Sequence, residues 1–328
     1  MSVPLAPFTT LRLGGPADRL VEAHDEHELI EAVRDEDPAL ILAGGSNVVI
    51  ADEGVRGTVV AVRTTGIAHA QDLLVVQAGE PWDRVVEYTV ANGLQGFECL
   101  SGIPGSTGAT PIQNVGAYGQ DVSETVAWVR VYDRETRRTQ TMTAAECGFD
   151  YRTSVFKYHA RRVVLAVAFK LDRSPHSGPL RYAELARTLD VPVGGTAPLG
   201  DVREAVLALR RGKGMVIDPA DPDSVSAGSF FTNPILPADR IPDGAPAWPE
   251  PDGRVKTSAA WLIERSGFGR GHGSGPAGIS TKHTLALVNR GGATTAELMA
   301  LARQIAAAVK AQFGVDLHPE PVLVGHRW

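Results

Sequence analysis

The sequence has 328 residues, of which 43% are hydrophobic and 21% are charged, and its formal net charge is −6. A chain of this length is expected to form two or three domains, since a domain usually holds roughly 100–200 residues. The negative charge and the lack of a lysine- and arginine-rich run argue against nucleic-acid binding, which needs a basic surface.

The first third of the chain alternates helix and strand patterns. Glu28–Arg34 has apolar residues at helical spacing. Pro81 opens a second helix, because proline suits the first helical turn, and Asn92-Gly93 ends it. Short apolar runs predict buried strands at residues 39–43, 48–51, 58–62 and 73–78.

The rest of the chain continues this mixture, and the class predicted is α+β with mixed sheets. Asp201 and Glu204 form a capping pair for a predicted helix at 201–211. Thr294 and Glu297 form a capping-box pattern ahead of an amphipathic helix. Residues 212–256 are rich in loops. The other predicted elements are strands at 126–132, 163–171 and 321–324 and a helix at 257–265.

Cysteine usage and the absence of targeting segments predict a cytoplasmic protein. Cys99 and Cys147 are not part of a metal-binding sequence pattern, so we expect two reduced cysteines in the hydrophobic core. The N-terminus lacks the basic and apolar regions of a signal peptide. The apolar stretch Val163–Phe169 is much shorter than the ~20 residues of a membrane span.

A first glycine loop, Gly44-Gly45-Ser46-Asn47, follows a predicted strand. Glycines there let the backbone approach a ligand closely and turn its N–H groups toward an anion. Taken alone, four such residues are better explained as an ordinary tight turn. The loop does not match the glycine pattern of a Rossmann fold, and the chain contains no P-loop pattern.

A second glycine loop lies within residues 99–120, CLSGIPGSTGATPIQNVGAYGQ, where Gly102, Gly105 and Gly108 recur at intervals of three. A purely structural loop is normally shorter or more polar. Such a density of small residues and hydroxyls suits a pyrophosphate and a flat ring lying against the backbone. Two loops of this kind in one chain favour a binding site over a pair of ordinary turns.

Further motifs accompany the two loops along almost the whole chain. The full set is Thr10–Ala17, Gly44–Asn47, Ile103–Ser106, Pro111–Gly119, Tyr151–Lys157, Ala227–Pro234 and His318–Glu320. Taken together, these motifs resemble the UDP-N-acetylenolpyruvoylglucosamine reductase family. The resemblance implies an FAD-binding domain of the vanillyl-alcohol-oxidase type, made of two lobes, and an α+β substrate-binding domain.

The implied reaction has two halves. NADPH reduces a non-covalently bound FAD, and the flavin then delivers hydride to the vinyl carbon of UDP-N-acetylglucosamine enolpyruvate, giving UDP-N-acetylmuramate for peptidoglycan synthesis. The protein orients the reactants and manages charge. Electrons pushed into the substrate carboxylate need cationic stabilisation, and the adjacent carbon needs a proton.

Three residues match the catalytic positions of the family. Arg152 resembles the arginine that clamps the carboxylate, since its fork donates two parallel hydrogen bonds. Ser229 resembles the proton donor. Glu320 resembles the acidic partner, and a glutamate facing a carboxylate would need a raised pKa. Each would be read as a surface or structural residue if it stood alone, so the motifs carry these assignments.

The resemblance also implies the binding residues. For FAD they are Gly44, Gly45, Ser46, Asn47, Ile103, Pro104, Gly105, Ser106, Gly108, Ala109, Asn114, Gly116, Ala117, Tyr118 and Gly119. For the substrate they are Tyr182, Lys213, Asn233, Trp248, Arg270 and His283.

Two departures from the family pattern stand out. One form of the family closes a loop with a tyrosine over the substrate, and Pro242–Asp252 resembles that loop but carries Trp248 instead. Tryptophan can stack and donate one N–H, but it cannot replace a phenol. The alternative for Trp248 is a hydrophobic plug under a proline-rich loop. Thr232 stands where many members have lysine.

The implied domain boundaries are residues 1–65 with 315–328 for the first FAD lobe, 66–212 for the second, and 213–314 for the substrate domain. We expect a monomer that binds the UDP-sugar and NADPH, without nucleic acid, membrane or metal. One rival is an oxidase of the same flavin superfamily, although Gly44–Asn47 lacks the histidine that often links FAD covalently. A second is a catalytically silent nucleotide-sugar binder, which would lack the clamp and the acid.

Overall fold

The computed structural model describes residues 2–328, which group by contacts into two compact units. Unit 1 comprises residues up to 3, 17–45 and 55–212, and unit 2 comprises 4–16, 46–54 and 213–328. The division into three lobes remains a prediction.

Unit 1 contains a parallel sheet and a larger antiparallel sheet. In the parallel sheet, β2 (Pro16–Ala23) and β3 (Leu40–Leu42) flank β5 (Val55–Val62), and α1 (Glu26–Glu36) belongs to the same hydrophobic core. The antiparallel sheet has the order β12 (Arg138–Thr143), β11 (Val126–Asp133), β13 (Arg162–Lys170), β7 (Leu73–Gln77) and β6 (Ile67–Ala70). Parallel and antiparallel sheets combined with helices confirm the α+β class.

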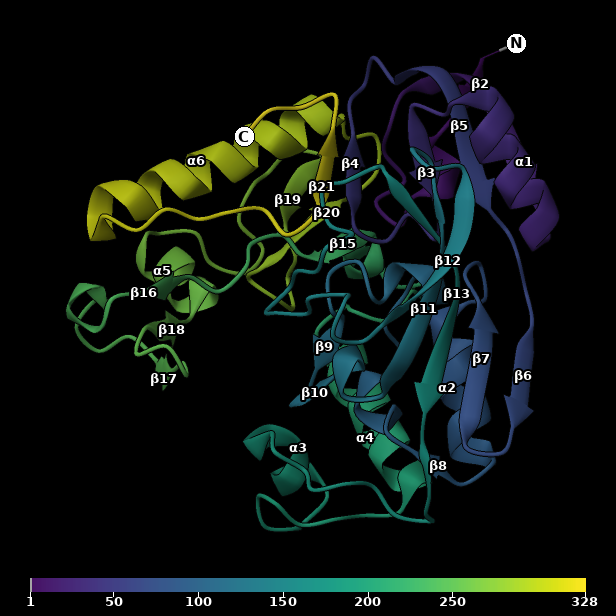
Figure 1. Cartoon of the computed structure of the whole chain (residues 1–328). Coiled ribbons are helices and arrows are strands. Elements are labelled where there is room, and N and C mark those ends of the chain that lie inside the picture. The colour runs from purple at the N-terminus through teal and green to yellow at the C-terminus, as the bar shows by residue number, and fades with distance from the viewer. Residues whose placement is uncertain (1) are drawn as a thin grey trace. The chain divides into compact units, whose positions relative to one another are not determined.

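The core of unit 1 is built where α2 (Trp82–Ala91) packs along the antiparallel sheet (Figure 1). Trp82, Phe97 and Phe169 are fully buried. The ring centroid of Phe97 lies 4.8 Å from that of Trp82 and 4.8 Å from that of Phe169. Aromatic pairs at such distances contribute about 1 kcal/mol each beyond the area they bury. This cluster therefore anchors the helix that follows Pro81.

The remaining elements of unit 1 are short, apart from one helix. α4 begins at Leu199, so Asp201 lies inside its first turn and the capping pair expected at Asp201 is wrong. The other elements are β8 (Leu94–Gln95) paired with β14 (Asp172–Arg173), β9 (Gly116–Ala117) paired with β10 (Gln120–Asp121), α3 (Ala183–Thr188) and α4 (Leu199–Gly212).

Unit 2 joins three small sheets to α5 (Ala259–Arg265) and α6 (Thr295–Phe313). The capping box of α6 is confirmed, with Thr294 and Glu297 exchanging both hydrogen bonds. The sheets are β4 (Val48–Ile50) with β21 (Val322–Val324); β15 (Ser226–Ser229), β20 (Ala286–Asn289) and β19 (Ala277–Ile279); and β16 (Ile235–Leu236), β18 (Val255–Thr257) and β17 (Ala247–Pro249).

Both cysteines are buried and unpaired, as the sequence predicts. Burial raises the pKa of the Cys99 thiol to about 12 and that of Cys147 to about 11. Within residues 2–328, no helix has both the length and the apolarity that crossing a membrane requires.

Candidate functional site

Within unit 1, Gly44 of the first glycine loop lies against Gly105 and Ser106 of the second. A Cβ atom added to Gly44 would lie 2.6 Å from the Cα of Gly105 and 3.2 Å from the amide nitrogen of Ser106. Real Cβ atoms do not approach other atoms so closely, so a side chain at Gly44 would force the loops apart. The glycine is needed for this close approach, and the two loops form one surface.

The second loop is fastened to the segment that leads into α2. The amide of Thr107 donates to the carbonyl of Glu80 over 2.9 Å, and that of Gly108 donates to Ala78 over 2.8 Å. A Cβ atom at Gly108 would lie 2.6 Å from the Cβ of Ala78. The backbone of the loop is therefore held in one shape by contacts that leave no room for side chains.

These features fit the cofactor that the motifs imply. The glycine at the contact lets the two loops lie backbone against backbone, with Gly44 beside Gly105 and the amide nitrogen of Ser106. Backbone amides and hydroxyls exposed on a surface without side chains suit a pyrophosphate and a flat ring. The observed shape of the loops thus agrees with FAD binding by this part of unit 1.

Arg152 has a structural task that its motif did not reveal. Its Nη2 donates to the carbonyl of Gly116 over 2.6 Å, and its Nη1 donates to the carbonyl of Asn114 over 3.3 Å. The carboxylate of Asp121 lies 3.5 Å from Nη1. The Arg152 backbone adopts the left-handed conformation, with φ of 53°. The guanidinium therefore ties its own turn to the predicted flavin-binding segment.

That segment is also held by Asn114, whose φ is 46°. Its side-chain Nδ2 donates to the carbonyl of Asp150 over 3.2 Å, and its Oδ1 accepts from the amide of Ser123 over 3.1 Å. Further along, the ring of Tyr118 meets that of Tyr182 edge to face, with centroids 5.3 Å apart. The structure thus brings a predicted cofactor residue and a predicted substrate residue into contact within unit 1.

In unit 2, Ser229 and Glu320 lie on neighbouring segments. The amide of Glu320 donates to the carbonyl of Phe230 over 2.8 Å, one residue after Ser229. The side-chain amide of Asn47 reaches the carbonyl of Glu320 over 3.4 Å. Gly228, with φ of 73°, turns the chain just before Ser229. The backbone pairing therefore brings the segment that carries the predicted proton donor alongside the segment that carries the predicted acid.

The other predicted substrate residues of unit 2 lie on several elements. Lys213 follows α4, and the Asn233 side chain accepts from the amide of Ala259 at the start of α5 over 3.0 Å. His283 accepts at Nδ1 from the amide of Leu285 over 3.1 Å, so its neutral ring carries the proton on Nε2.

The last two predicted substrate residues are Trp248 and Arg270. Trp248 lies on β17 and is 46% exposed, which does not agree with a plug buried under the loop. Arg270 lies in the turn between α5 and β19.

Asp83, on the first turn of α2, was not among the residues predicted from the sequence. Its Oδ1 accepts from the amide of Gly102 over 2.6 Å, where the second glycine loop begins. Arg203 of α4 donates to both carboxylate oxygens, over 2.7 and 3.0 Å. Burial raises the pKa of Asp83, but the bonds from Arg203 and Gly102 outweigh it and hold this pKa below its usual value. No local pattern announces this contact, since 120 residues separate Arg203 from Asp83.

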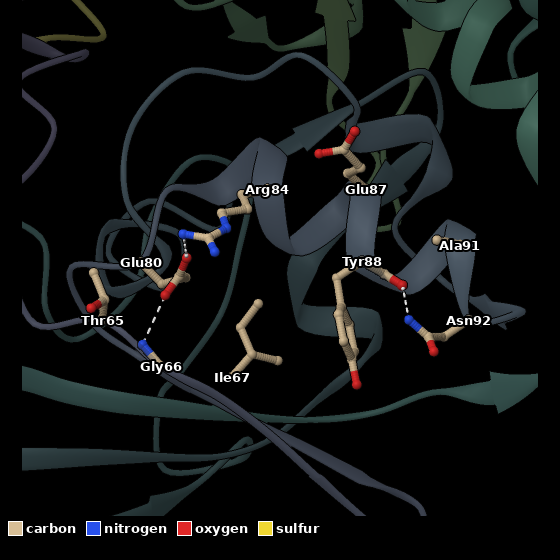
Figure 2. Close-up of a pocket in the computed structure, with 9 residues that line it drawn as sticks. All are labelled: Thr65, Gly66, Ile67, Glu80, Arg84, Glu87, Tyr88, Ala91 and Asn92. Atoms are coloured by element: carbon tan, nitrogen blue, oxygen red, sulfur yellow. Dashed lines mark hydrogen bonds and ion pairs between the residues drawn. The ribbon is translucent and has the colours of Figure 1, made fainter.

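Unit 1 also has a cavity of about 530 Å³ between α2 and the chain leading into β6 (Figure 2). Glu80 lies in its wall, with a carboxylate that accepts from the amide of Gly66 over 2.8 Å and lies 3.5 Å from Arg84. None of the predicted site residues lines this cavity. Within residues 2–328, no group of three or more histidine, cysteine or acidic side chains is placed to hold a metal ion.

Comparison with known proteins agrees with this arrangement. Residues 17–141 match the family described as FAD binding domain, and residues 219–324 match UDP-N-acetylenolpyruvoylglucosamine reductase, C-terminal domain. The reductase of that name from Thermobifida fusca is 58% identical over 99% of this chain and 97% of its own. That from Salinispora arenicola is 58% identical over 98% of this chain and 94% of its own.

A solved structure is similar over the same extent. The crystal structure of UDP-N-acetylenolpyruvylglucosamine reductase from Thermus caldophilus has a TM-score of 0.70 and 25% identity, and covers 99% of this chain and 98% of its own. The match to these relatives runs over nearly the whole length of both chains. The chain therefore belongs to the UDP-N-acetylenolpyruvoylglucosamine reductase family, and it is an FAD-dependent oxidoreductase.

Proposed function

We propose that this chain reduces UDP-N-acetylglucosamine enolpyruvate to UDP-N-acetylmuramate with NADPH, in the cytoplasmic synthesis of peptidoglycan precursors. The observation that carries the proposal is the 58% identity to a reductase of that name across 99% of this chain. The joint presence of Arg152, Ser229 and Glu320 in their motifs supports it, because a silent binding protein would not need all three.

When bound without a covalent link, FAD would supply hydride chemistry at the site. The glycine loops would hold it: Gly44 lets the first loop lie against Gly105 of the second, and Gly108 keeps the second loop against Ala78. Arg152 supports the same surface through the carbonyls of Asn114 and Gly116. An intact Arg152 is thus expected to matter for cofactor binding as well as for the reaction.

At the substrate, Arg152 would also stabilise the carboxylate. Negative charge grows on that carboxylate as the vinyl carbon accepts hydride, and a fixed cation stabilises such charge best when little reorganisation is needed. The carbonyls that hold the guanidinium fix its position in advance. Lysine in its place would keep the charge but lose the planar fork that contacts two acceptors at once.

Ser229 would donate the proton that completes the reduction. A hydroxyl is a weak acid, so it can act only where the forming carbanion is already stabilised and where its own position is fixed. The backbone pairing beside it restricts Ser229, and Glu320 is carried by the paired segment. We assign Glu320 to the other side of the substrate carboxylate, as in the family motif.

An anaerobic titration of the purified protein tests the proposal. NADPH should bleach the flavin absorbance, and UDP-N-acetylglucosamine enolpyruvate should restore it without oxygen. Bleaching without recovery would reject the substrate and leave a flavoenzyme of another kind. Fast recovery with oxygen alone would favour an oxidase, and a protein that binds no FAD would reject the proposal altogether.

Ser229→Ala separates the two halves of the reaction. We expect flavin reduction by NADPH within about threefold of the wild-type rate and reoxidation by the substrate slowed by about 10²-fold or more, the scale of general acid catalysis. Ser266→Ala, which removes a hydroxyl bonded to the carbonyl of Leu262 in α5, is the control and should change neither rate. Equal damage to both half-reactions would contradict the assignment of Ser229.

A further inference from the structure

Asp223 is a buried carboxylate in unit 2 that has no part in the reaction described above. It lies in a short helical turn, Pro222–Ser224, and is 7% exposed. Its Oδ1 accepts from the amide of Thr281 over 2.9 Å, and its Oδ2 accepts from the Thr281 hydroxyl over 2.5 Å. Both oxygens are thus used to join two segments that are 58 residues apart.

The other side of Asp223 supports the chain that follows Lys213. Gly214 has φ of +65°, and a Cβ atom added there would lie 2.9 Å from the Cβ of Asp223 and 3.1 Å from its carbonyl oxygen. Any larger residue would push the segment away. The backbone directly after Lys213 therefore packs on the residue that also binds Thr281.

The segment joined to Asp223 ends in His283. Lys282 lies next to Thr281 and forms an ion pair with Asp221 over 2.8 Å. This ion pair is a second link between the segment of Asp223 and that of Thr281. The hydroxyl of Ser280 accepts from the amide of His283 over 3.2 Å. With Nδ1 accepting from the amide of Leu285, the ring of His283 is held in one orientation, and its neutral form carries the N–H at Nε2.

One residue thus joins two segments that carry predicted substrate residues: its carboxylate binds Thr281, and its Cβ and backbone carbonyl pack beside Gly214. Lys213 ends in an ammonium group and His283 presents an N–H, and both are donors suited to the oxygens of a diphosphate. A pair of donors binds an anion well only if its spacing is set before binding, because ordering flexible side chains costs affinity.

We propose that Asp223 is a positioning residue, which sets the placement of Lys213 and His283 for the diphosphate of the UDP-sugar. The inference rests on the proposed function. Burial raises the pKa of Asp223, but the bonds from Thr281 and the charge of Lys282 hold it below its usual value, so the carboxylate is ionised in the neutral range.

The main test compares Asp223→Ala with Asp223→Asn in FAD-loaded protein. Alanine removes both bonds to Thr281 but keeps the Cβ and backbone atoms that lie near Gly214. We therefore expect KM for the enolpyruvyl substrate to rise by about tenfold and kcat to change by less than about threefold. Asparagine can accept from the Thr281 amide and donate to its hydroxyl, so the KM of Asp223→Asn should lie close to the wild-type value. Asp316→Ala, which removes an exposed carboxylate paired with Lys310, is the control.

A double-mutant cycle tests the mechanism of the effect. If Asp223 acts through His283, the KM of Asp223→Ala combined with His283→Ala should be no worse than that of the more severe single variant. Fully additive effects would overturn the inference. A KM equal to wild type in folded Asp223→Ala, or asparagine as damaging as alanine, would overturn it as well.

Thr281→Val covers the case in which Asp223→Ala does not fold. Valine has the shape of threonine and keeps the hydrogen bond from the backbone amide of residue 281 to Oδ1 of Asp223. The substitution removes only the hydrogen bond from the hydroxyl to Oδ2. A KM raised by about threefold supports the inference, and an unchanged KM overturns it. Wild-type protein that shows no turnover would instead reject the proposed function, so the two failures are distinguishable.

Discussion

Replacing Arg203 with alanine should destabilise unit 1 and weaken its hold on the flavin. The guanidinium binds both oxygens of Asp83, and Asp83 in turn binds the amide of Gly102 at the start of the second glycine loop. In Arg203→Ala the carboxylate keeps only the Gly102 bond and loses its counter-charge. The change therefore affects α2, α4 and the loop together.

The exposure of the two side chains sets the magnitude. Arg203 is 12% exposed and Asp83 is 40% exposed. Exposed pairs contribute about 0.2–1 kcal/mol, whereas breaking a buried pair costs about 3–5 kcal/mol. A pair with one buried and one half-exposed partner lies between these limits, so we expect a loss of about 2 kcal/mol in the free energy of unfolding.

Urea denaturation at neutral pH, with flavin fluorescence as a second readout, measures this loss. Lys170→Ala is the matched control, because its ion pair with Asp72 is 67% and 61% exposed and should contribute about 0.5 kcal/mol or less. The pair with Arg203 lowers the pKa of Asp83 below 3.8, its value in the unfolded chain. The pair therefore stabilises the folded protein above pH 3.8, and this stabilisation is lost as the pH falls through the lower pKa of the folded state. Equal losses in the two variants, or a deficit in Arg203→Ala that persists in acid, would refute the reasoning.

Three further outcomes are expected. Gly108→Ala would place a Cβ atom 2.6 Å from that of Ala78, so the purified variant should contain far less FAD than wild type by flavin absorbance, and full occupancy would contradict the tight packing. Asp52 accepts from the amides of the first two residues of α6 over 2.8 and 2.9 Å. Asp52→Ala should therefore lower the free energy of unfolding, measured in urea, by about 1 kcal/mol. No loss would show that the capping box of Thr294 is enough to stabilise the start of α6. Cys99, with its pKa raised to about 12 by burial, should react with a thiol reagent at neutral pH only after unfolding, and rapid labelling of native protein would refute its burial.

Much of the fold could be predicted from local patterns. The periodicity of Glu28–Arg34 lies within α1, and the capping box at Thr294 marks the start of α6 as observed. Both signals depend on residues three or four apart, which a sequence displays directly. The start of α4 was placed two residues late, because Asp201 looks like a cap although the chain is already helical there.

The glycine loops were recognised as a site because their composition is unusual over a short stretch. Their contact, with Gly44 against Gly105, appears only in the folded unit, since it joins segments about 60 residues apart. The same holds for Arg152, whose motif suggested a clamp for the substrate but not a support for the carbonyl of Gly116.

The sequence by itself therefore determined the α+β class, the family, the cofactor and the residues proposed for the chemistry, because these depend on composition, period and ordered motifs. The tertiary structure alone decided which polar groups hold them in place: Asp83 at the start of the second glycine loop and Asp223 between the segments of Lys213 and His283. Such partners are chosen by how distant segments pack, and a buried carboxylate must find donors wherever the fold brings them. No local pattern records that choice.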